Sequence, residues 1–268
     1  MEKIYVLGTG NALVTECFNT CFVLETDGGR LLVDCGGGNG ILRQLKKAEI
    51  DIHSIHDVFL THCHCDHFTG IVWIVRAVAA EMNKGRYEGN LNIWCHDELA
   101  AMVFPICRFM LGEKFSKHFD ERIFVNTLSD GCMEEVCGHS FTFFDIQSTK
   151  AKQFGFAADL NCGSLVCMGD EPVNPVCEFY AENADWLLSE AFCLYEERET
   201  YHPYKKHHST AKDAAELAEK LHARNLVLWH TEEDHLTERK ALYTAEAEKY
   251  FHGRVFVPDD LEQISLED

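Results

Sequence analysis

Seven consecutive residues constrain this chain more than any other feature. Residues 61–67 read Thr-His-Cys-His-Cys-Asp-His, and they follow the short apolar run 58–60. The apolar run predicts a buried strand, so a loop that leaves it can curl the next side chains around one point. Neutral imidazoles and a carboxylate suit Zn²⁺, Mn²⁺ or Fe²⁺ as ligands. The segment therefore predicts a metal site, rather than a polar loop with scattered histidines. Its ligands would be His62, His64, Asp66 and His67.

The rest of the chain alternates between strand and helix patterns. Apolar runs predict strands at residues 4–7, 21–24, 31–33, 91–94, 141–146, 164–168, 186–188, 226–229 and 255–257. Helical spacing appears at residues 41–45, 71–82, 99–103, 211–221 and 240–251, whereas 112–120 is charged and irregular. Thr210, with Asp213 three residues later, predicts a helix N-cap. This alternation is typical of a layered α/β fold, and without a Pro-rich or Gly/Ser-rich linker we expect residues 1–268 to form a single domain.

The composition indicates which partners are unfavourable for this protein and in which compartment it is expected. The chain has 44 acidic and 24 basic residues and a net charge of −20, which argues against long nucleic acid or an anionic membrane as a partner. The N-terminus runs directly into a strand pattern without a signal peptide, and the longest apolar stretch, residues 71–80, is too short to span a membrane. The 13 cysteines are odd in number and form no CxxC pair, so we expect reduced, mostly buried thiols in a cytoplasmic protein.

The metal-binding segment resembles a family signature. Thr-His-x-His-x-Asp-His followed by Gly70 is similar to the motif of the metallo-β-lactamase superfamily, and the resemblance covers nearly the whole chain. Asp34 resembles the early strand-end aspartate of that family, Gly169-Asp170 the later Gly-Asp pair, and Trp229-His230 the last strand-end histidine. The resemblance implies an α/β fold, a four-layer αββα sandwich with the metals at one edge of its two sheets.

The same resemblance implies a role for each candidate ligand. Its members hold one ion with histidines at site 1 and another with an aspartate and two histidines at site 2, and a second aspartate bridges the ions. The matching positions are His62 and His64 for site 1, Asp66, His67 and His230 for site 2, and Asp170 for the bridge. One or two Zn²⁺ ions, or Mn²⁺ or Fe, would activate a water as hydroxide. Asp66 would orient that hydroxide or accept its proton.

One position departs from the family pattern. The family usually places another histidine between the first motif and Gly-Asp, and counting back from Gly155-Phe156 puts that slot at Thr149, next to Ser148 and Lys150. None of these is an ordinary zinc ligand, so site 1 is expected to be weak, empty or completed by another residue. Lys150 would place an ammonium where an ion normally sits. Three residues remain as substitute ligands if the backbone places their side chains at site 1: His139, Cys63 and Cys65.

The C-terminal half resembles ribonuclease Z and its phosphodiesterase relatives. His208-Ser209-Thr210 is similar to the His-Ser-Thr helix entry of that branch, and Ser189-Glu190-Ala191 to its His-Glu-Ala-Thr segment. The resemblance implies that His208 donates a proton to the leaving oxygen and is oriented by Glu190. The alternative is that His207 and His208 belong to a solvated basic loop.

These features favour a metal-dependent hydrolase, a phosphodiesterase that uses metal-bound hydroxide. The Gly/Pro-rich arm with which transfer-RNA-processing relatives grip RNA is missing, so a small or nucleotide-type phosphodiester, such as a cyclic phosphate, fits better. The alternatives are a thioester or lactone hydrolase of the same fold and a degenerate metal-binding protein without one site-1 histidine. A di-iron oxidoreductase fits less well, because that branch usually carries an acidic residue where His64 stands. The resemblance also admits a homodimer.

Overall fold

Two seven-stranded sheets form the centre of the structure, a computed structural model that describes residues 1–267. Across the first sheet the order is β14 (Gln263–Ser265), β1 (Lys3–Gly8), β2 (Cys21–Glu25), β3 (Arg30–Val33), β4 (Asp57–Phe59), β5 (Leu91–His96) and β6 (Ile123–Leu128). Across the second sheet it is β13 (Arg254–Phe256), β12 (Asn225–Trp229), β11 (Trp186–Glu190), β10 (Gly163–Cys167), β9 (Phe154–Leu160), β8 (His139–Asp145) and β7 (Cys132–Val136).

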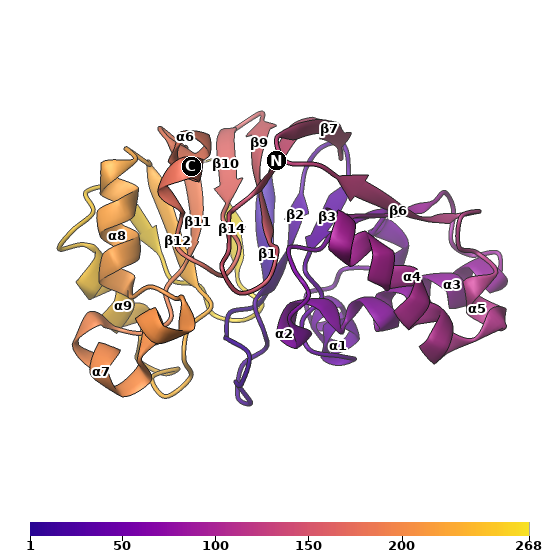
Figure 1. The fold of residues 1–268 in the computed structure, drawn as a ribbon, viewed down its shortest axis with the longest axis horizontal. Coiled ribbons are helices and arrows are strands. Elements are labelled where there is room, and N and C mark those ends of the chain that lie inside the picture. Colours follow the sequence, from indigo (N-terminus) through magenta and orange to yellow (C-terminus); the bar gives the residue numbers. More distant parts are fainter. Residues whose placement is uncertain (268) are drawn as a thin grey trace.

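Helices cover the outer face of each sheet (Figure 1). The first sheet is covered by α1 (Gly40–Lys47), α3 (Ile71–Asn83) and α4 (Asp97–Leu111), and the second by α8 (Ala211–Lys220) and α9 (Arg239–Ala247). The short helices are α2 (Cys65–Phe68), α5 (Glu113–Ser116), α6 (Glu178–Ala181) and α7 (Arg198–Tyr201), with 3-10 turns at Ile52–Ser54, Pro175–Cys177, Tyr195–Glu197 and Pro203–Lys206. These four layers confirm the predicted αββα sandwich.

Alternating side chains divide the apolar core into three parts. In β2, Phe22 and Leu24 point between the sheets, where they meet phenylalanines of the second sheet such as Phe141. Cys21 and Val23 point the other way, into the core under α1 and α3. Because successive residues of a strand face opposite sides, one short run fills two core layers.

The carboxyl ends of parallel strands from both sheets meet at one edge. In the first sheet β3 pairs in parallel with β4, and in the second sheet β10, β11 and β12 are parallel. Parallel strands end at the same edge of their sheet, so the residues that follow them gather there. The residues at these ends are Asp34, His62, Asp170, Glu190 and His230.

Helix α8 begins with the predicted cap. The Thr210 hydroxyl accepts the backbone N–H of Asp213, and the Asp213 carboxylate accepts the backbone N–H of Thr210 at 2.9 Å. We expect Thr210→Ala to lower the free energy of unfolding by about 1 kcal/mol, because a backbone donor of the first turn loses its acceptor. Denaturant titration measures this loss, and Thr210→Ser, which keeps the hydroxyl, is the control. Equal unfolding midpoints for the two variants would contradict the capping role.

Some elements differ from the sequence prediction. Residues 112–120, expected to be irregular, contain α5. Four strands were not predicted, namely β6, β7, β9 and β14. Strand β7 lies at a sheet edge with Met133, Glu134 and Glu135 exposed, so it lacks the apolar alternation of a half-buried strand. Strand β14 has only three residues, too few to show a period.

The thiols and the helices agree with the compositional analysis. Eight of the 13 cysteines are buried, all are free, and only Cys63 and Cys65 are exposed. Small apolar packing therefore accounts for most of them, as predicted. Within residues 1–267, no helix has the length and apolar character needed to cross a membrane.

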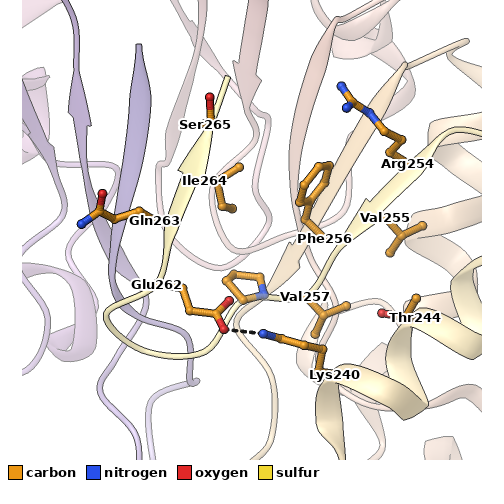
Figure 2. A pocket seen from close by; sticks show the side chains of 11 residues that line it. Lys240, Thr244, Arg254, Val255, Phe256, Val257, Glu262, Gln263, Ile264 and Ser265 are labelled. Atoms are coloured by element: carbon orange, nitrogen blue, oxygen red, sulfur yellow. Dashed lines mark hydrogen bonds and ion pairs between the residues drawn. The ribbon is translucent and has the colours of Figure 1, made fainter. Parts of the chain in front are cut away.

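A cavity of about 400 Å³ lies at the open end of the sandwich, between edge strands β13 and β14 (Figure 2). Apolar side chains such as Phe256 and Ile264 line it, and Lys240 forms an ion pair with Glu262 at its mouth. Its lining contains no histidine or cysteine. Two of its charged side chains, Lys240 and Glu262, pair with each other, so we do not assign the functional site to this cavity.

Candidate metal centre

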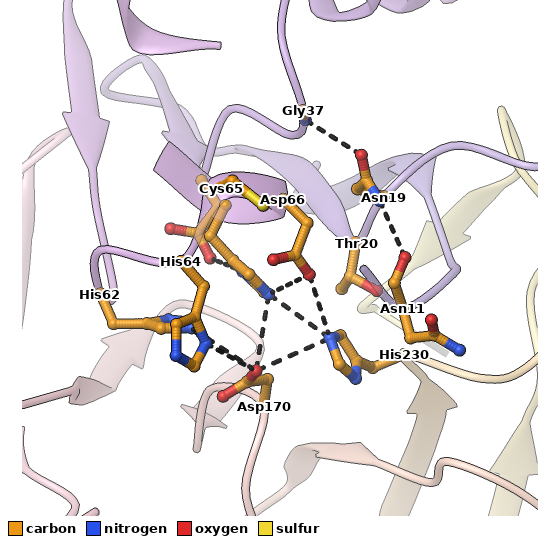
Figure 3. Close-up of polar contacts among 12 residues, drawn as sticks. Asn11, Asn19, Thr20, Gly37, His62, His64, Cys65, Asp66, Asp170 and His230 are labelled. Carbon is orange, nitrogen blue, oxygen red and sulfur yellow. Dashed lines mark hydrogen bonds and ion pairs between the residues drawn. The ribbon is translucent and has the colours of Figure 1, made fainter. Parts of the chain in front are cut away.

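Ligand atoms from three side chains gather on one side of the cluster, next to Asp170 (Figure 3). The Nε2 atom of His67 lies 3.3 Å from Asp66 Oδ2 and 3.4 Å from His230 Nε2, and the distance from His230 Nε2 to Asp66 Oδ2 is 3.7 Å. Asp170 Oδ2 lies 3.7 Å from both imidazole nitrogens. Ligands about 2.0–2.1 Å from a tetrahedral zinc are spaced in this way. Asp66, His67 and His230, the three residues predicted for site 2, therefore form a group that can hold one ion, and the Asp170 oxygen lies next to it.

The other side of the cluster holds two histidines. His62 Nε2 and His64 Nδ1 lie 2.8 Å apart, and Asp170 Oδ2 is 3.5 Å from the first and 4.0 Å from the second. The same carboxylate oxygen thus faces imidazoles on both sides, as expected of a bridging ligand. The structure brings together all six residues predicted to bind metal, although they come from three separate segments of the chain.

Asp34 fixes the orientation of the first motif. Its Oδ2 atom lies 2.7 Å from His67 Nδ1, and its two oxygens accept the backbone N–H and the hydroxyl of Thr61 at 2.9 and 2.8 Å. A hydrogen bond from His67 Nδ1–H to the carboxylate leaves Nε2 free as a metal ligand. The Thr61 hydroxyl also contacts His62 Nδ1 at 2.9 Å, which directs His62 Nε2 into the cluster.

Replacing Asp34 by alanine is expected to weaken metal binding by about 10- to 100-fold, because it removes the group that orients His67. Competition against a chromogenic chelator measures this affinity. Asp27→Ala, an exposed aspartate near the β2–β3 turn, is the matched control and should bind metal as the unmodified chain does. Equal affinities for the two variants would show that Asp34 does not support the cluster.

The backbone around the cluster is constrained. Asp34 and His230 have φ of 56° and 60°, a left-handed conformation that costs energy in a residue with a side chain. At Gly70 a Cβ atom would lie 1.9 Å from the carbonyl oxygen of Cys35, so only glycine lets the start of α3 approach the β3 end this closely. The glycine of the predicted motif is thus required by packing next to the cluster.

Burial and mutual contacts set the charge of the cluster. Burial alone would raise the pKa of Asp66 and Asp170, but neighbouring histidines, through hydrogen bonds and charge, hold both pKa values well below the usual range. Burial lowers the pKa of His64 and His230. Burial would also lower the pKa of His67, but the charge and hydrogen bond of Asp34 raise it well above its ordinary value.

The lowered pKa values of Asp66, Asp170, His64 and His230 suit a divalent cation. His67, whose pKa is raised, would release a proton when an ion binds. Ionised carboxylates and neutral imidazoles are the forms that bind metal. Asp170 Oδ1 and His230 Nδ1 are buried without a hydrogen-bond partner. Burying such polar atoms costs free energy unless another group, such as an ion, interacts with them. The donor set, with imidazole nitrogens and carboxylate oxygens from buried side chains, fits Zn²⁺, Mn²⁺ or Fe²⁺.

His208 lies beside the cluster and is buried. Its Nδ1 atom lies 2.9 Å from the backbone carbonyl oxygen of Asp170 and 3.6 Å from Glu190 Oε2. The fully buried Glu190 accepts the backbone N–H of Ser209 at 2.6 Å through its other oxygen. Glu190 therefore holds the backbone next to His208, and the hydrogen bond of the ring itself goes to the Asp170 carbonyl. The solvated-loop alternative is wrong for His208 and right for the exposed His207.

A cavity of about 480 Å³ opens above the cluster and contains residues that the sequence did not single out. The loop residues Asn11, Ala12 and Leu13 form one wall. Phe192 and Lys206 line it near His208. The Phe192 ring stacks on His208 with centroids 4.9 Å apart and an interplanar angle of 17°. Only the basic run before the His-Ser-Thr segment hinted at Lys206, and no sequence signal indicated Phe192.

The structure shows where the position of the missing site-1 histidine lies, and where its three candidate replacements lie. The Thr149 hydroxyl lies 2.7 Å from His207 Nδ1, and Lys150 lines the cavity. His139 is remote from the cluster, because its Nε2 contacts Asp27 and Glu2. Cys63 lines a separate cavity with His96 and Leu99. Cys65 lines the metal cavity but belongs to none of the metal-compatible groups found among residues 1–267. His139 and Cys63 therefore do not stand in for the missing histidine, and within residues 1–267 no metal-compatible group joins Cys65 to His62 or Asp170.

The sandwich and its edge cluster define a hydrolase of the metallo-β-lactamase superfamily close to ribonuclease Z, and hydrolases of this superfamily are metal-dependent. A family model described as Anti-Pycsar protein Apyc1 matches residues 2–247. The chain belongs to that family.

Individual relatives extend over different shares of the chain. A ribonuclease Z of Thermobifida fusca (strain YX) is 23% identical over 317 residues, covering 99% of this chain and 95% of that protein. A ribonuclease Z of Phocaeicola vulgatus is 29% identical over 139 residues, covering 51% of this chain and only 41% of that protein.

Solved structures share the fold at low identity. The metallo-β-lactamase fold protein YhfI of Bacillus subtilis has a TM-score of 0.80 at 19% identity, and the match covers 98% of both chains. A diphosphatase of the PhnP family has a TM-score of 0.74 at 16% identity, covering 99% of this chain and 98% of the other.

Proposed function

We propose that this protein hydrolyses a small or nucleotide-type phosphodiester at the Asp66–His67–His230 cluster, with His208 as general acid. The observation that carries the proposal is the position of His208. A nitrogen of its ring lies within 4.8 Å of ligand atoms of Asp170 and His230, yet Nδ1 is engaged by the Asp170 carbonyl. Nε2 is therefore left for the cavity, where a proton donor to a leaving oxygen is needed.

The metal-binding residues supply the other half of the reaction. When bound, one or two ions would provide an activated water and a Lewis acid that stabilises charge on phosphorus. Asp66 Oδ2 lies beside the ligand nitrogens of His67 and His230, where an attacking water would be held, and its carboxylate would accept the proton of that water. His208 Nε2–H donates a proton to the departing oxygen, and the Asp170 carbonyl and the Phe192 ring keep the imidazole in place.

The printed names of the relatives support a phosphate ester as substrate. Ribonuclease Z names an enzyme that acts on RNA, and a PhnP-family relative is a diphosphatase. The net charge of −20 opposes binding of a long polyanion, which favours a small phosphodiester over RNA. The cavity of about 480 Å³ has the size of a small-molecule site.

A substrate panel tests the proposal. Purified protein loaded with Zn²⁺ or Mn²⁺ is assayed with bis(p-nitrophenyl) phosphate, 3′,5′- and 2′,3′-cyclic nucleotides, a precursor transfer RNA, p-nitrophenyl acetate and a thioester. We expect turnover of the small phosphodiesters. Turnover of the acetate or thioester alone would replace this function with hydrolysis at carbon. Preference for the transfer RNA would contradict the small-substrate assignment, and inactivity on every compound would favour the degenerate metal-binding alternative.

A further inference from the structure

The two halves of the metal cluster are unequal. On one side Asp66, His67 and His230 offer three ligand atoms besides the shared Asp170 oxygen. On the other side only His62 and His64 accompany that oxygen. Among residues 1–267, the metal-compatible groups add no further histidine, cysteine or carboxylate from outside the cluster to His62. An ion on the His62–His64 side would therefore have fewer protein ligands and a weaker hold.

Lys150 occupies the wall of the cavity on this incomplete side. It lines the cavity together with His64, and its ammonium lies 3.5 Å from Glu171 Oε1. Glu171 is buried, and the same oxygen accepts the Ser148 hydroxyl at 2.8 Å. The Ser148 hydroxyl also accepts the backbone N–H of Lys150 at 3.2 Å. The lysine is thus held by a closed set of contacts next to Asp170, rather than lying free on the surface.

The charge of Lys150 has two consequences. The ammonium of Lys150, which lines the cavity with His64, repels a divalent cation on the His62–His64 side. The same ammonium attracts an anion that enters the cavity. The His62–His64 side of the cluster, which lacks a metal ligand, therefore carries the ammonium of Lys150 instead.

A second ammonium lines the same cavity. Lys206 Nζ lies 4.7 Å from the centroid of the Phe192 ring, which also stacks on the imidazole of His208. A cation over an aromatic face is held by the ring quadrupole. In a chain with 44 acidic and 24 basic residues, these two lysines balance Asp66 and Asp170 in the cavity lining, so a bound metal ion would make this site positive.

We infer that the metal centre is functionally asymmetric: it holds one ion tightly at Asp66–His67–His230 and a second only weakly at His62–His64, where Lys150 binds a non-bridging oxygen of the substrate phosphate. The inference rests on the proposed function. A phosphodiester has two non-bridging oxygens that share one negative charge, and the Lys150 N–H donates to one of them while Lys206 stabilises the same anion from the Phe192 side. Lys150 is thereby a substrate-binding residue of this chain.

Metal and phosphate titrations test the inference without turnover. Full-length protein is stripped of metal and titrated with Zn²⁺ by calorimetry, and inorganic phosphate is then titrated into the one-ion form. The variant is Lys150→Met, and the matched control is Lys152→Met, which removes a lysine two residues away that pairs with Asp97 outside this cavity. Lys150→Arg keeps the positive charge. It shows whether weaker phosphate binding comes from loss of that charge or from loss of the loop structure.

Each outcome of these titrations either supports or contradicts the inference. We expect two Zn²⁺ affinities at least about tenfold apart in the unmodified chain, and Lys150→Met should weaken phosphate binding about tenfold while it tightens the second ion. Lys152→Met and Lys150→Arg should bind phosphate as the unmodified chain does. Two equal zinc affinities, or undiminished phosphate binding by Lys150→Met, would overturn the inference. If the titrations turn out as expected but no phosphodiester is hydrolysed, the proposed function fails and the anion site remains.

Discussion

Replacing Asp66 by alanine should abolish phosphodiester turnover while the chain stays folded. Asp66 is buried, its Oδ2 atom faces both His67 and His230, and these two histidines hold its pKa well below the ordinary value. The substitution removes a metal ligand and the proposed acceptor of the water's proton in one step. Loss of the proton acceptor alone is worth about 10²- to 10⁴-fold in rate, and loss of the ligand adds to it. Steady-state kinetics on bis(p-nitrophenyl) phosphate measures the loss.

A neighbouring residue provides the control for Asp66→Ala. Cys63 lies in the same loop and is exposed, but it lines a different cavity. Cys63→Ala should keep both metal content and turnover, which would also show that its thiol is not a ligand. Circular dichroism and elemental mass spectrometry accompany the kinetics of both variants. Unchanged turnover in the folded Asp66→Ala variant would rule out the proposed mechanism.

Replacing His208 by alanine should lower kcat by about 10²- to 10⁴-fold without loss of metal, because the proposed role of this imidazole is to donate a proton rather than to bind the ion. The size of the effect should depend on the leaving group. p-Nitrophenolate departs without help, whereas the alkoxide of a nucleoside needs a proton, so the loss should be larger for a cyclic nucleotide. This dependence separates a general acid from a residue that only shapes the cavity.

Two measurements can contradict the role of His208. Its ring nitrogen lies near ligand atoms of Asp170 and His230, so His208 itself could hold an ion. Loss of metal in His208→Ala would assign it to the ligand set instead. An equal loss of rate for both leaving groups would mean that it does not donate the proton. His207→Ala, which changes the exposed neighbour, should remain near the unmodified rate.

Glu190 illustrates where a resemblance and the geometry differ in detail. The resemblance implied that this carboxylate orients His208. In the structure one oxygen of Glu190 accepts the Ser209 N–H, and the other lies 3.6 Å from His208 Nδ1, beyond hydrogen-bonding distance. Glu190 positions the peptide that carries His208, while the Asp170 carbonyl contacts the ring. The direct partner of the His208 ring is a backbone carbonyl oxygen. Every residue has such an atom, so the sequence could not indicate which one contacts the ring.

The sequence by itself determined the elements with strong local signals. The strand before His62, the hairpin of β2 and β3, the cap of α8 and most of the helices follow from apolar periodicity and turn residues that lie close together in the chain. The ligand types also follow from the sequence, because three imidazoles and one carboxylate lie within seven residues. Weak strands such as β9, with glycine and two alanines, carried no such signal.

Only the tertiary structure decided how distant residues share the cluster. Asp170 and His230 follow strands of the second sheet and His62 follows a strand of the first, so their meeting depends on how the two sheets pack. The same packing places His139 away from the cluster and brings Lys150, Phe192 and Lys206 to its cavity. Sequence specifies local conformation and the chemistry of each side chain. Side-chain distances across the two sheets depend on long-range packing, and no local pattern records them.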